Sequence, residues 1–287
     1  MRFYWLLALA VTAVPAWSAD KTALPGYVIP RSEVRTLPVN AAGRHYALFV
    51  GLPASYGTDP NKRYPVVYVT DGYWDFQKIT TIHGPLVYDK YAPEFITVGM
   101  GYAGENPNFG ELRRWELSPV AFGAGDATGR ARDFLDTIEK VFIPLIDKEY
   151  RTDPKQRVLG GASLGGLFTL YSMFTKPDLF NAYVAVTPAV LVGDSWLLKY
   201  EEEFRKSGKT LNARLYMTVG GNEATSFVAP ILRMNQRFAP GRYPKLAYEF
   251  RIIDGERHAG NQIESYNRGL RFVFAPMAPE QGPSIDR

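Results

Sequence analysis

Short apolar segments alternate along the chain with longer segments in which apolar residues recur every three or four positions. The short segments predict β-strands, and continuous apolar character is typical of strands that are buried on both faces of a parallel sheet. The long segments predict amphipathic helices that cover such a sheet. The predicted strands are residues 32–37, 45–50, 65–70, 94–100, 157–162, 182–186, 213–219 and 245–253.

The predicted helices are residues 74–91, 131–150, 164–171, 195–206, 227–238 and 263–274. We expect a break near Gly84-Pro85 and a kink at Pro144, because proline cannot donate a backbone hydrogen bond. Strands that alternate with helices predict an α/β fold with a mainly parallel central sheet and helices on both faces. The sequence contains no recognisable repeat or linker, so residues 20–287 are predicted to form a single domain.

Residues 101–128 show no clear periodicity and contain several glycines and prolines. Long irregular segments in compact domains are usually functional or disordered. This segment carries Arg113, Arg114 and Trp115, so we expect it to be a loop that faces the substrate.

The first residues resemble an export signal. Arg2 precedes an apolar run that is followed by small residues, and cleavage could follow Ala16, Ser18 or Ala19. Residues 1–19 are therefore predicted to be a signal peptide that directs the mature protein to the periplasm or the medium. The run is too short for a convincing membrane span, so no stable membrane insertion is expected after cleavage.

The composition narrows the possible chemistry. Hydrophobic residues make up 46% of the 287 residues, which is enough for a large core. The absence of cysteine excludes disulfides, a thiolate nucleophile and cysteine metal sites, and three histidines argue against a histidine-rich metal site. No metal or organic cofactor is predicted. The 33 basic and 29 acidic residues are well mixed, so no nucleic-acid surface is expected.

The strongest chemical signal is the stretch Gly161-Ala162-Ser163-Leu164-Gly165, which lies between a predicted strand and a predicted helix. In that context the G-x-S-x-G pattern predicts a nucleophile elbow, with Ser163 as nucleophile. Glycine is favoured two residues before and after the serine because side chains would collide in the tight crossing. The backbone N–H of Leu164 is predicted to donate to the oxyanion.

A serine hydroxyl needs a base to take its proton, and histidine is best suited to this near neutral pH. His45 begins a predicted strand and His83 lies in an apolar helix, so we expect structural roles for both. His258 follows the last strand, where an elbow-type fold has its base. The acid should come between the serine and this histidine in the chain. Glu223 is the first candidate and Asp194 the alternative.

A second oxyanion donor is expected from the loop after residues 65–70, so from the backbone N–H of Gly72 or Tyr73. Arg113 or Arg114 could hold an anionic or catechol-like group of a substrate. The alternative for both arginines is a surface ion pair.

Several stretches together resemble a known family. They are residues 64–72 with their strand-Asp-Gly ending, residues 113–119, the elbow residues 161–168, residues 220–223, and His258. They look like the esterase-D-like esterases of the α/β-hydrolase superfamily, and within it the hydrolases related to the periplasmic enterochelin (siderophore) esterases. The resemblance implies Ser163 as nucleophile, His258 as base and Arg113 near the substrate. The family also includes enzymes that act on feruloyl and acetyl esters of sugars.

We therefore expect an exported serine esterase that forms an acyl-enzyme on Ser163 with His258 as base. Its partner would be a small-molecule ester, either of siderophore type or a feruloyl or acetyl ester of a sugar. A serine peptidase or acyltransferase on the same fold is one alternative, and a non-catalytic protein that binds a catechol or glycan is another. The particular ester and the oligomeric state do not follow from the sequence.

Overall fold

The structure is a computed structural model, and it describes residues 28–121 and 129–279. The expected signal peptide, residues 1–19, and residues 122–128 of the expected loop lie outside the described residues. Within the described ranges, no helix combines the length and the apolar character that crossing a membrane requires.

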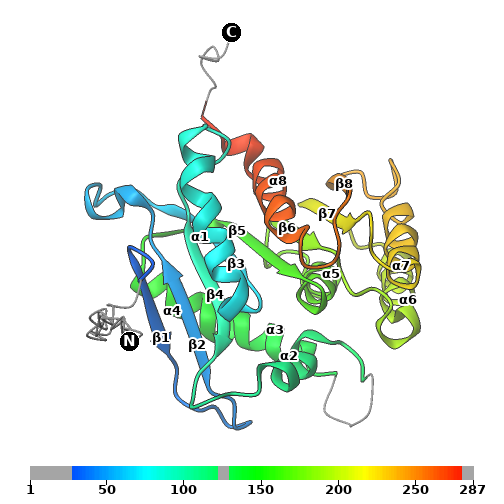
Figure 1. Ribbon diagram of the computed structural model, residues 1–287, viewed down its shortest axis with the longest axis horizontal. Helices are drawn as coiled ribbons and strands as arrows, with labels where there is room; N and C mark the ends of the chain where they lie inside the picture. The colour runs from blue at the N-terminus through cyan, green and yellow to red at the C-terminus, as the bar shows by residue number, and fades with distance from the viewer. Residues whose placement is uncertain (1–27, 122–128, 280–287) are drawn as a thin grey trace, which may run out of the picture.

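The strands of the described residues are β1 (Ser32–Thr36), β2 (Tyr46–Gly51), β3 (Tyr64–Val69), β4 (Ile96–Tyr102), β5 (Thr152–Ala162), β6 (Ala182–Val186), β7 (Arg214–Gly220) and β8 (Ala247–Ile253). They form one sheet in the order β1-β2-β4-β3-β5-β6-β7-β8, which runs through the centre of the molecule (Figure 1). β2 pairs antiparallel with both β1 and β4, and the other neighbours are parallel. The predicted mainly parallel sheet is confirmed.

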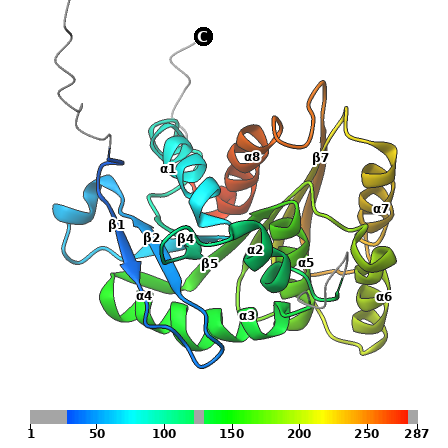
Figure 2. The same ribbon diagram turned by 60° about the horizontal axis from the view of Figure 1, so that its bottom comes forward.

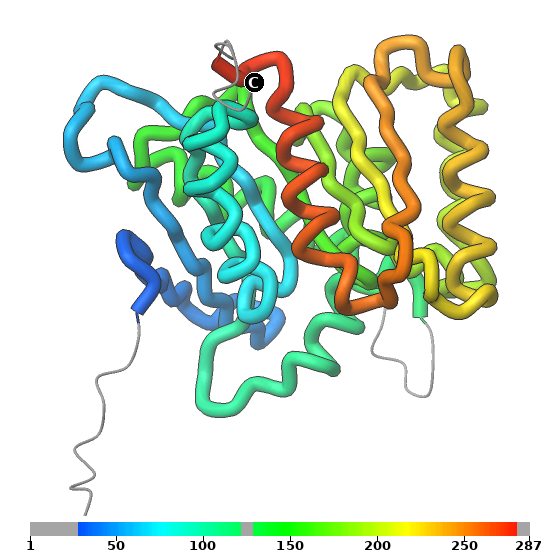
Figure 3. Tube along the Cα trace, turned by 45° about the horizontal axis from the view of Figure 1, so that its top comes forward, coloured from blue at the N-terminus to red at the C-terminus, as the bar shows by residue number. Residues whose placement is uncertain are grey.

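The helices of the described residues are α1 (Gly72–Tyr88), α2 (Phe109–Leu117), α3 (Ala131–Thr137), α4 (Ile143–Glu149), α5 (Leu164–Thr175), α6 (Val192–Lys206), α7 (Thr225–Gln236) and α8 (Gln262–Phe274). Two 3-10 helices, Ala54–Gly57 and Ala275–Met277, and a π turn, Ile138–Phe142, are also present. Helices α1 and α8 lie side by side on one face of the sheet (Figure 3). Helices α3, α4 and α5 lie on the opposite face (Figure 2), so the prediction of two helical layers is confirmed.

The two layers explain why a central strand such as β3 is apolar at every position. Successive side chains of a strand point to opposite faces of the sheet. In β3, Val67 and Val69 pack in the cluster formed with α1 and α8, whereas Val66 and Tyr68 pack in the cluster on the other face. All four side chains are buried.

Helix α2 lies within the segment that we expected to be an irregular loop. Its N-cap is Asn108, whose side-chain oxygen accepts the backbone N–H of Glu111 at 3.2 Å. Only Glu116 and Leu117 at its C-terminal end are buried. A helix with one buried turn leaves no periodic apolar pattern, so the loop prediction was wrong for residues 109–117.

The prolines disturb the helices less than expected. Helix α1 continues through Pro85 to Tyr88 without the expected break, because only one hydrogen bond near the end of the helix is lost. The long helix before β5 is interrupted by the π turn 138–142, not by a bend at Pro144 itself. Pro144 stands in the first turn of α4, where a missing N–H costs least.

A buried polar network joins α1 to α8. The Tyr266 hydroxyl donates to Asp75 Oδ2 at 2.6 Å, and Lys78 Nζ contacts Asp75 Oδ1 at 2.5 Å and Gln262 Oε1 at 2.6 Å. Burial is the largest influence on Asp75 and raises its pKa, although the contacts with Lys78 and Tyr266 oppose the rise. The network fixes the helix that begins at Gly72 against the helix that follows the His258 loop.

Candidate active site

The sharp turn at Ser163 joins β5 to α5. Ser163 has φ 59° and ψ −116°, a conformation that non-glycine residues rarely adopt and that costs free energy. Its backbone is held in place by the next strand and by the segment that follows it. The Ser163 N–H donates to the Val186 carbonyl at 3.0 Å, and the Ser163 carbonyl accepts from Ala189 at 2.9 Å. These bonds maintain the strained turn that a nucleophile elbow requires.

The glycines of the motif have the steric role that we predicted. A Cβ atom on Gly161 would lie 2.5 Å from the carbonyl carbon of Gly165 and 2.5 Å from Thr70 Oγ1. A Cβ atom on Gly165 would overlap Thr70 Oγ1. The elbow therefore closes against the residue that follows β3.

Gly165→Ala is expected to destabilise the fold by roughly 1–3 kcal/mol, because overpacking of this size forces the backbone or its neighbour to move. Thr70 is fully buried, and its hydroxyl has no hydrogen-bond partner among the described residues. Adding Thr70→Ala to Gly165→Ala should therefore restore part of the lost stability. Urea denaturation of the single and double variants measures both effects.

Gly84→Ala is the matched control for that experiment. Gly84 lies inside α1, and an added Cβ would have no neighbour within 4 Å. Alanine is favoured over glycine in a helix by about 1 kcal/mol, so this variant should be more stable than the wild type. A loss of stability in Gly84→Ala equal to that in Gly165→Ala would contradict the steric explanation.

Glu223 and His258 meet at the ends of β7 and β8. Glu223 Oε2 lies 2.7 Å from His258 Nδ1, and the Glu223 side chain is 2% exposed whereas that of His258 is 41% exposed. Burial raises the pKa of Glu223, but hydrogen bonds from His258, Thr187 and the Gly220 N–H outweigh it and leave the pKa lowered. The carboxylate is therefore ionised at neutral pH and can orient the imidazole.

Thr187 was not among the site residues predicted from the sequence. It follows β6 directly, is fully buried and has φ 40°. Its hydroxyl donates to Glu223 Oε1, which also accepts the Gly220 N–H at 2.9 Å. One carboxylate oxygen of Glu223 is thus held by Thr187 and Gly220, and the other contacts His258. A polar residue directly after a buried apolar strand was the signal that could have identified Thr187.

Four neighbouring parallel strands bring these residues to one edge of the sheet. Ser163, Thr187, Glu223 and His258 follow β5, β6, β7 and β8 in that order. The structure contains no hydrogen bond from Ser163 to His258 within its described ranges. Such catalytic bonds are often long in sites without substrate and shorten in the complex. Asp194 is exposed and makes no hydrogen bond to His258 among the same residues, so Glu223 is the acid that the geometry favours.

Phe227 lies beside His258 and lines the hollows next to both catalytic candidates, Ser163 and His258. Its ring stands edge-on to the His258 ring, with centroids 4.8 Å apart. Phe227 also lines two neighbouring hollows, one of about 470 Å³ beside Ser163 and one of about 620 Å³ beside His258. Both volumes are in the range of small-ligand sites. A substrate could therefore place one part on each side of the reacting centre.

The expected oxyanion donors begin two helices that follow neighbouring strands. Gly72 and Tyr73 start α1, Leu164 starts α5, and the first N–H groups of a helix have no partner within it. The strands before these helices, β3 and β5, are neighbours. Asp71, the N-cap of α1, has φ 52° and ψ 42°. The arrangement is compatible with the predicted oxyanion hole, whose donors remain a prediction.

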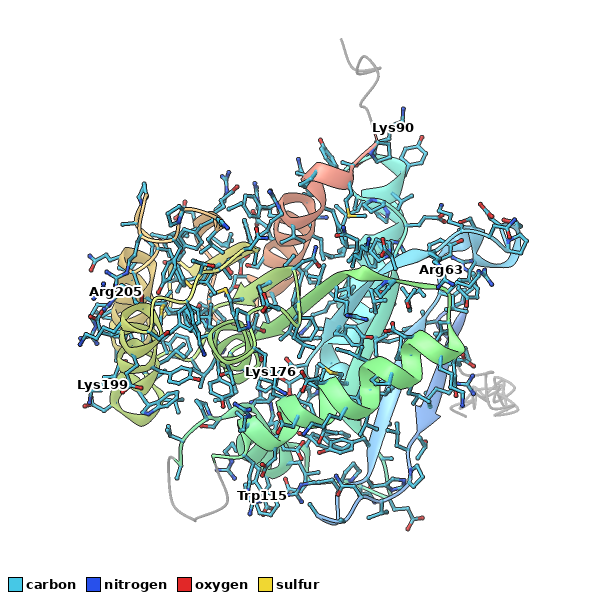
Figure 4. All side chains as sticks on the ribbon, turned by 180° about the vertical axis from the view of Figure 1, so that it is seen from behind. Arg63, Lys90, Trp115, Lys176, Lys199 and Arg205 are labelled. Carbon is cyan, nitrogen blue, oxygen red and sulfur yellow. The ribbon has the colours of Figure 1, made fainter. Side chains whose placement is uncertain are left out.

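The residues predicted to bind substrate have different surroundings. Arg113 and Arg114 both line the hollow beside Ser163. Arg113 donates from Nε and Nη2 to the two carboxylate oxygens of Asp71, each at 2.8 Å. Arg114 is exposed and donates to the Gly110 carbonyl. Trp115, labelled in Figure 4, packs against the Arg44 guanidinium, which lies 3.8 Å from the ring centre. Of these residues, Trp115 is absent from the described lining of that hollow.

The other two histidines lie elsewhere. His83 accepts the Phe95 N–H at 3.2 Å and stacks on the Phe95 ring, and burial lowers its pKa to about 4. The His45 carbonyl accepts the N–H of Ala103. Among the described residues, no group of three or more His, Asp or Glu side chains is arranged to hold a metal ion.

Comparison with known proteins places the chain among esterases. Residues 39–226 match a family model described as "Putative esterase". Ferri-bacillibactin esterase BesA of Bacillus subtilis is 27% identical over 270 residues, which cover 88% of this chain and 93% of BesA. The siderophore triacetylfusarinine C esterase of Aspergillus fumigatus is 27% identical over 186 residues, which cover 63% of each chain.

Solved structures agree on the fold. The BES protein from Bacillus cereus is 28% identical with a TM-score of 0.77, over 86% of this chain and 96% of that protein. An IroE-like serine hydrolase from Shewanella oneidensis is 23% identical with a TM-score of 0.78, over 87% and 82% of the two chains. The predicted α/β-hydrolase fold is therefore confirmed.

Proposed function

The chain belongs to the putative esterase family, and on that premise we propose that it hydrolyses a carboxylic ester through an acyl-enzyme on Ser163. The observation that carries the proposal is the contact of 2.7 Å between Glu223 and His258 at the strand edge that also carries the Ser163 turn. The Glu223 carboxylate accepts the hydrogen bond from Nδ1 of the imidazole. Nε2 is then the nitrogen that can take a proton from Ser163.

The reaction proceeds in two halves. Ser163 Oγ attacks the ester carbonyl carbon while His258 Nε2 takes its proton, and the oxyanion accepts hydrogen bonds from Leu164 and from Gly72 or Tyr73. The tetrahedral intermediate then collapses, and His258 returns the proton to the departing alcohol. In the second half, water gives its proton to His258 and attacks the acyl carbon. The bond to Ser163 Oγ then breaks, Ser163 takes the proton back from His258, and the acid is released.

We propose a siderophore-type ester as the substrate class. The relatives named above are esterases of ferri-bacillibactin and of triacetylfusarinine C. The hollow beside Ser163 is lined mainly by apolar atoms, and Arg113 and Arg114 are among its lining residues. Phe109, which directly precedes Gly110 of the hollow's lining, stacks on Tyr73 with ring centres 4.7 Å apart. Such surroundings suit an aromatic acyl group.

A substrate panel tests this assignment. A catecholate trilactone, a feruloylated sugar, an acetylated sugar and a short p-nitrophenyl ester would be incubated with the purified mature protein. We expect the trilactone to have the highest kcat/KM. A higher value for either sugar ester would contradict the siderophore assignment and leave the esterase assignment intact. Amide cleavage or acyl transfer to an added alcohol, without ester hydrolysis, would contradict both.

We also propose that the protein is exported. The support is the charged start, the apolar run and the small residues of positions 1–19. When the full chain is produced in a Gram-negative host, the protein in the periplasmic fraction should begin at residue 17, 19 or 20. Recovery of the full-length chain from the cytoplasm alone would contradict export.

A further inference from the structure

The bidentate pair between Arg113 and Asp71 lies next to the reacting centre. Its two bonds are each 2.8 Å long, and the side chains of Arg113 and Asp71 are 19% and 6% exposed. An Arg–carboxylate fork of this kind is strong and fixes orientation as well as distance. Arg113 belongs to α2, whereas Asp71 is the residue directly before Gly72. The pair therefore connects the helix above the site to the turn that is predicted to bind the oxyanion.

Asp71 determines the course of that turn. It has a left-handed backbone, which is uncommon for a residue other than glycine. Its carbonyl accepts the N–H groups of Trp74 at 2.8 Å and Asp75 at 3.0 Å, so the first turn of α1 begins there. Its carboxylate makes no N-cap bond, because Arg113 holds it instead. Arg113 thus restrains the residue that aims the N–H groups of Gly72 and Tyr73.

The charge of Asp71 also matters. A Cβ atom built on Gly165 would lie 3.3 Å from Asp71 Oδ2, so the carboxylate is adjacent to the elbow. A negative charge at that position would repel the oxyanion that forms on the substrate, and repulsion is strong in a partly buried site. The guanidinium of Arg113 neutralises the carboxylate. Without it, a buried charge would be left unpaired beside the reaction.

Helix α2 is itself anchored away from the substrate. Glu116, on the same helix, is buried, accepts the Tyr46 hydroxyl at 2.7 Å and contacts Arg44 Nε at 3.1 Å. Both partners come from β2 or the loop before it. These contacts hold the C-terminal end of the helix that carries Arg113 against the core of the molecule.

We propose that Arg113 is a positioning residue that acts through Asp71: it holds the oxyanion turn and cancels the carboxylate charge beside it. This inference rests on the proposed esterase function. It replaces the expectation that Arg113 binds an anionic part of the substrate. The two roles differ in what they require of the substrate, because a positioning residue is needed even for an ester that carries no charge.

The test uses a short neutral p-nitrophenyl ester and the variants Arg113→Met, Arg113→Lys, Asp71→Asn and Arg113→Met/Asp71→Asn. Arg113→Met should lower kcat about 10²-fold with little change in KM, a loss similar to that of one oxyanion donor. The double variant should regain about tenfold in kcat over Arg113→Met, because the unpaired charge is removed. Arg113→Lys, which keeps the charge but not the fork, should lie between Arg113→Met and the wild type.

Arg268→Met is the matched control. Arg268 pairs with Glu264 on the exposed face of α8 at 2.7 Å, and its loss should leave kcat unchanged. Circular dichroism and thermal melts check that each variant is folded. If Arg113→Met does not fold, the kcat values of Arg113→Lys and Asp71→Asn relative to the wild type decide the question.

Unchanged kcat in the folded Arg113 variants would overturn the inference, as would a double variant no faster than Arg113→Met. If the wild type shows no turnover that depends on Ser163, the proposed function fails and the inference falls with it. If the wild type turns over normally and the Arg113 variants are unaffected, the inference is wrong but the proposed esterase function stands.

Discussion

Ser163→Ala is expected to lower kcat/KM for ester hydrolysis at least about 10³-fold, because without the hydroxyl no acyl-enzyme can form. Alanine lacks only the oxygen, and the bonds that hold the turn come from the backbone of residue 163. The variant should therefore fold like the wild type. Hydrolysis of a short p-nitrophenyl ester gives the rate, and a fluorophosphonate probe should label the wild type but not the variant.

Ser172→Ala is the control for the serine experiment. Ser172 lies on the same helix, α5, is fully buried and donates to the Phe168 carbonyl at 2.7 Å. Its replacement should cost about 1 kcal/mol of stability and leave the turnover unchanged. Equal rates for the wild type and Ser163→Ala would refute the serine mechanism. A wild type that the probe does not label would favour a non-catalytic binding protein.

His258→Ala should have the second large effect, again at least about 10³-fold in kcat, because the Ser163 hydroxyl would lose its base. Glu223→Gln should cost up to about 10⁴-fold, because the amide can still contact Nδ1 but favours the wrong imidazole tautomer and cannot stabilise the imidazolium. The ratio of the two losses measures how far the reaction depends on the acid. The same p-nitrophenyl assay is suitable for both variants.

The other histidines provide internal controls. His45→Asn and His83→Gln should retain near wild-type kcat, because neither side chain lines the hollows beside Ser163 and His258. His83→Gln should lose some stability, as it disturbs the stack on Phe95. A large loss of activity at His45 or His83 together with an active His258→Ala would mean that the base had been assigned wrongly.

Much of the fold could be predicted because two of its central strands are apolar at every position. Such strands as β3 and β6 can be recognised without tertiary information. Helix α2 could not, because only its last turn is buried. The positions of Pro85 and Pro144 were visible, but whether a helix absorbs a proline depends on the hydrogen bonds around it. Local sequence does not contain that information.

The candidate site divides in the same way. Ser163, Glu223 and His258 could be placed from a motif and from chain order, because each follows its own strand. The pairing of Arg113 with Asp71 could not be foreseen, since the two residues are 42 positions apart and no pattern links them. Thr187 was missed for a similar reason: its hydroxyl matters only because Glu223 lies beside it.

The sheet order has a consequence for how the protein reaches its active form. Strand β3 pairs with β5, and the whole of α1, β4, α2, α3 and α4 lies between them in the chain. The oxyanion turn belongs to the first part of the chain, whereas the nucleophile, acid and base belong to the second. Contacts between distant parts of a chain form slowly, because the intervening segment must first be ordered. During refolding, helical signal should therefore return before catalytic turnover, and turnover reports the final docking of the two parts.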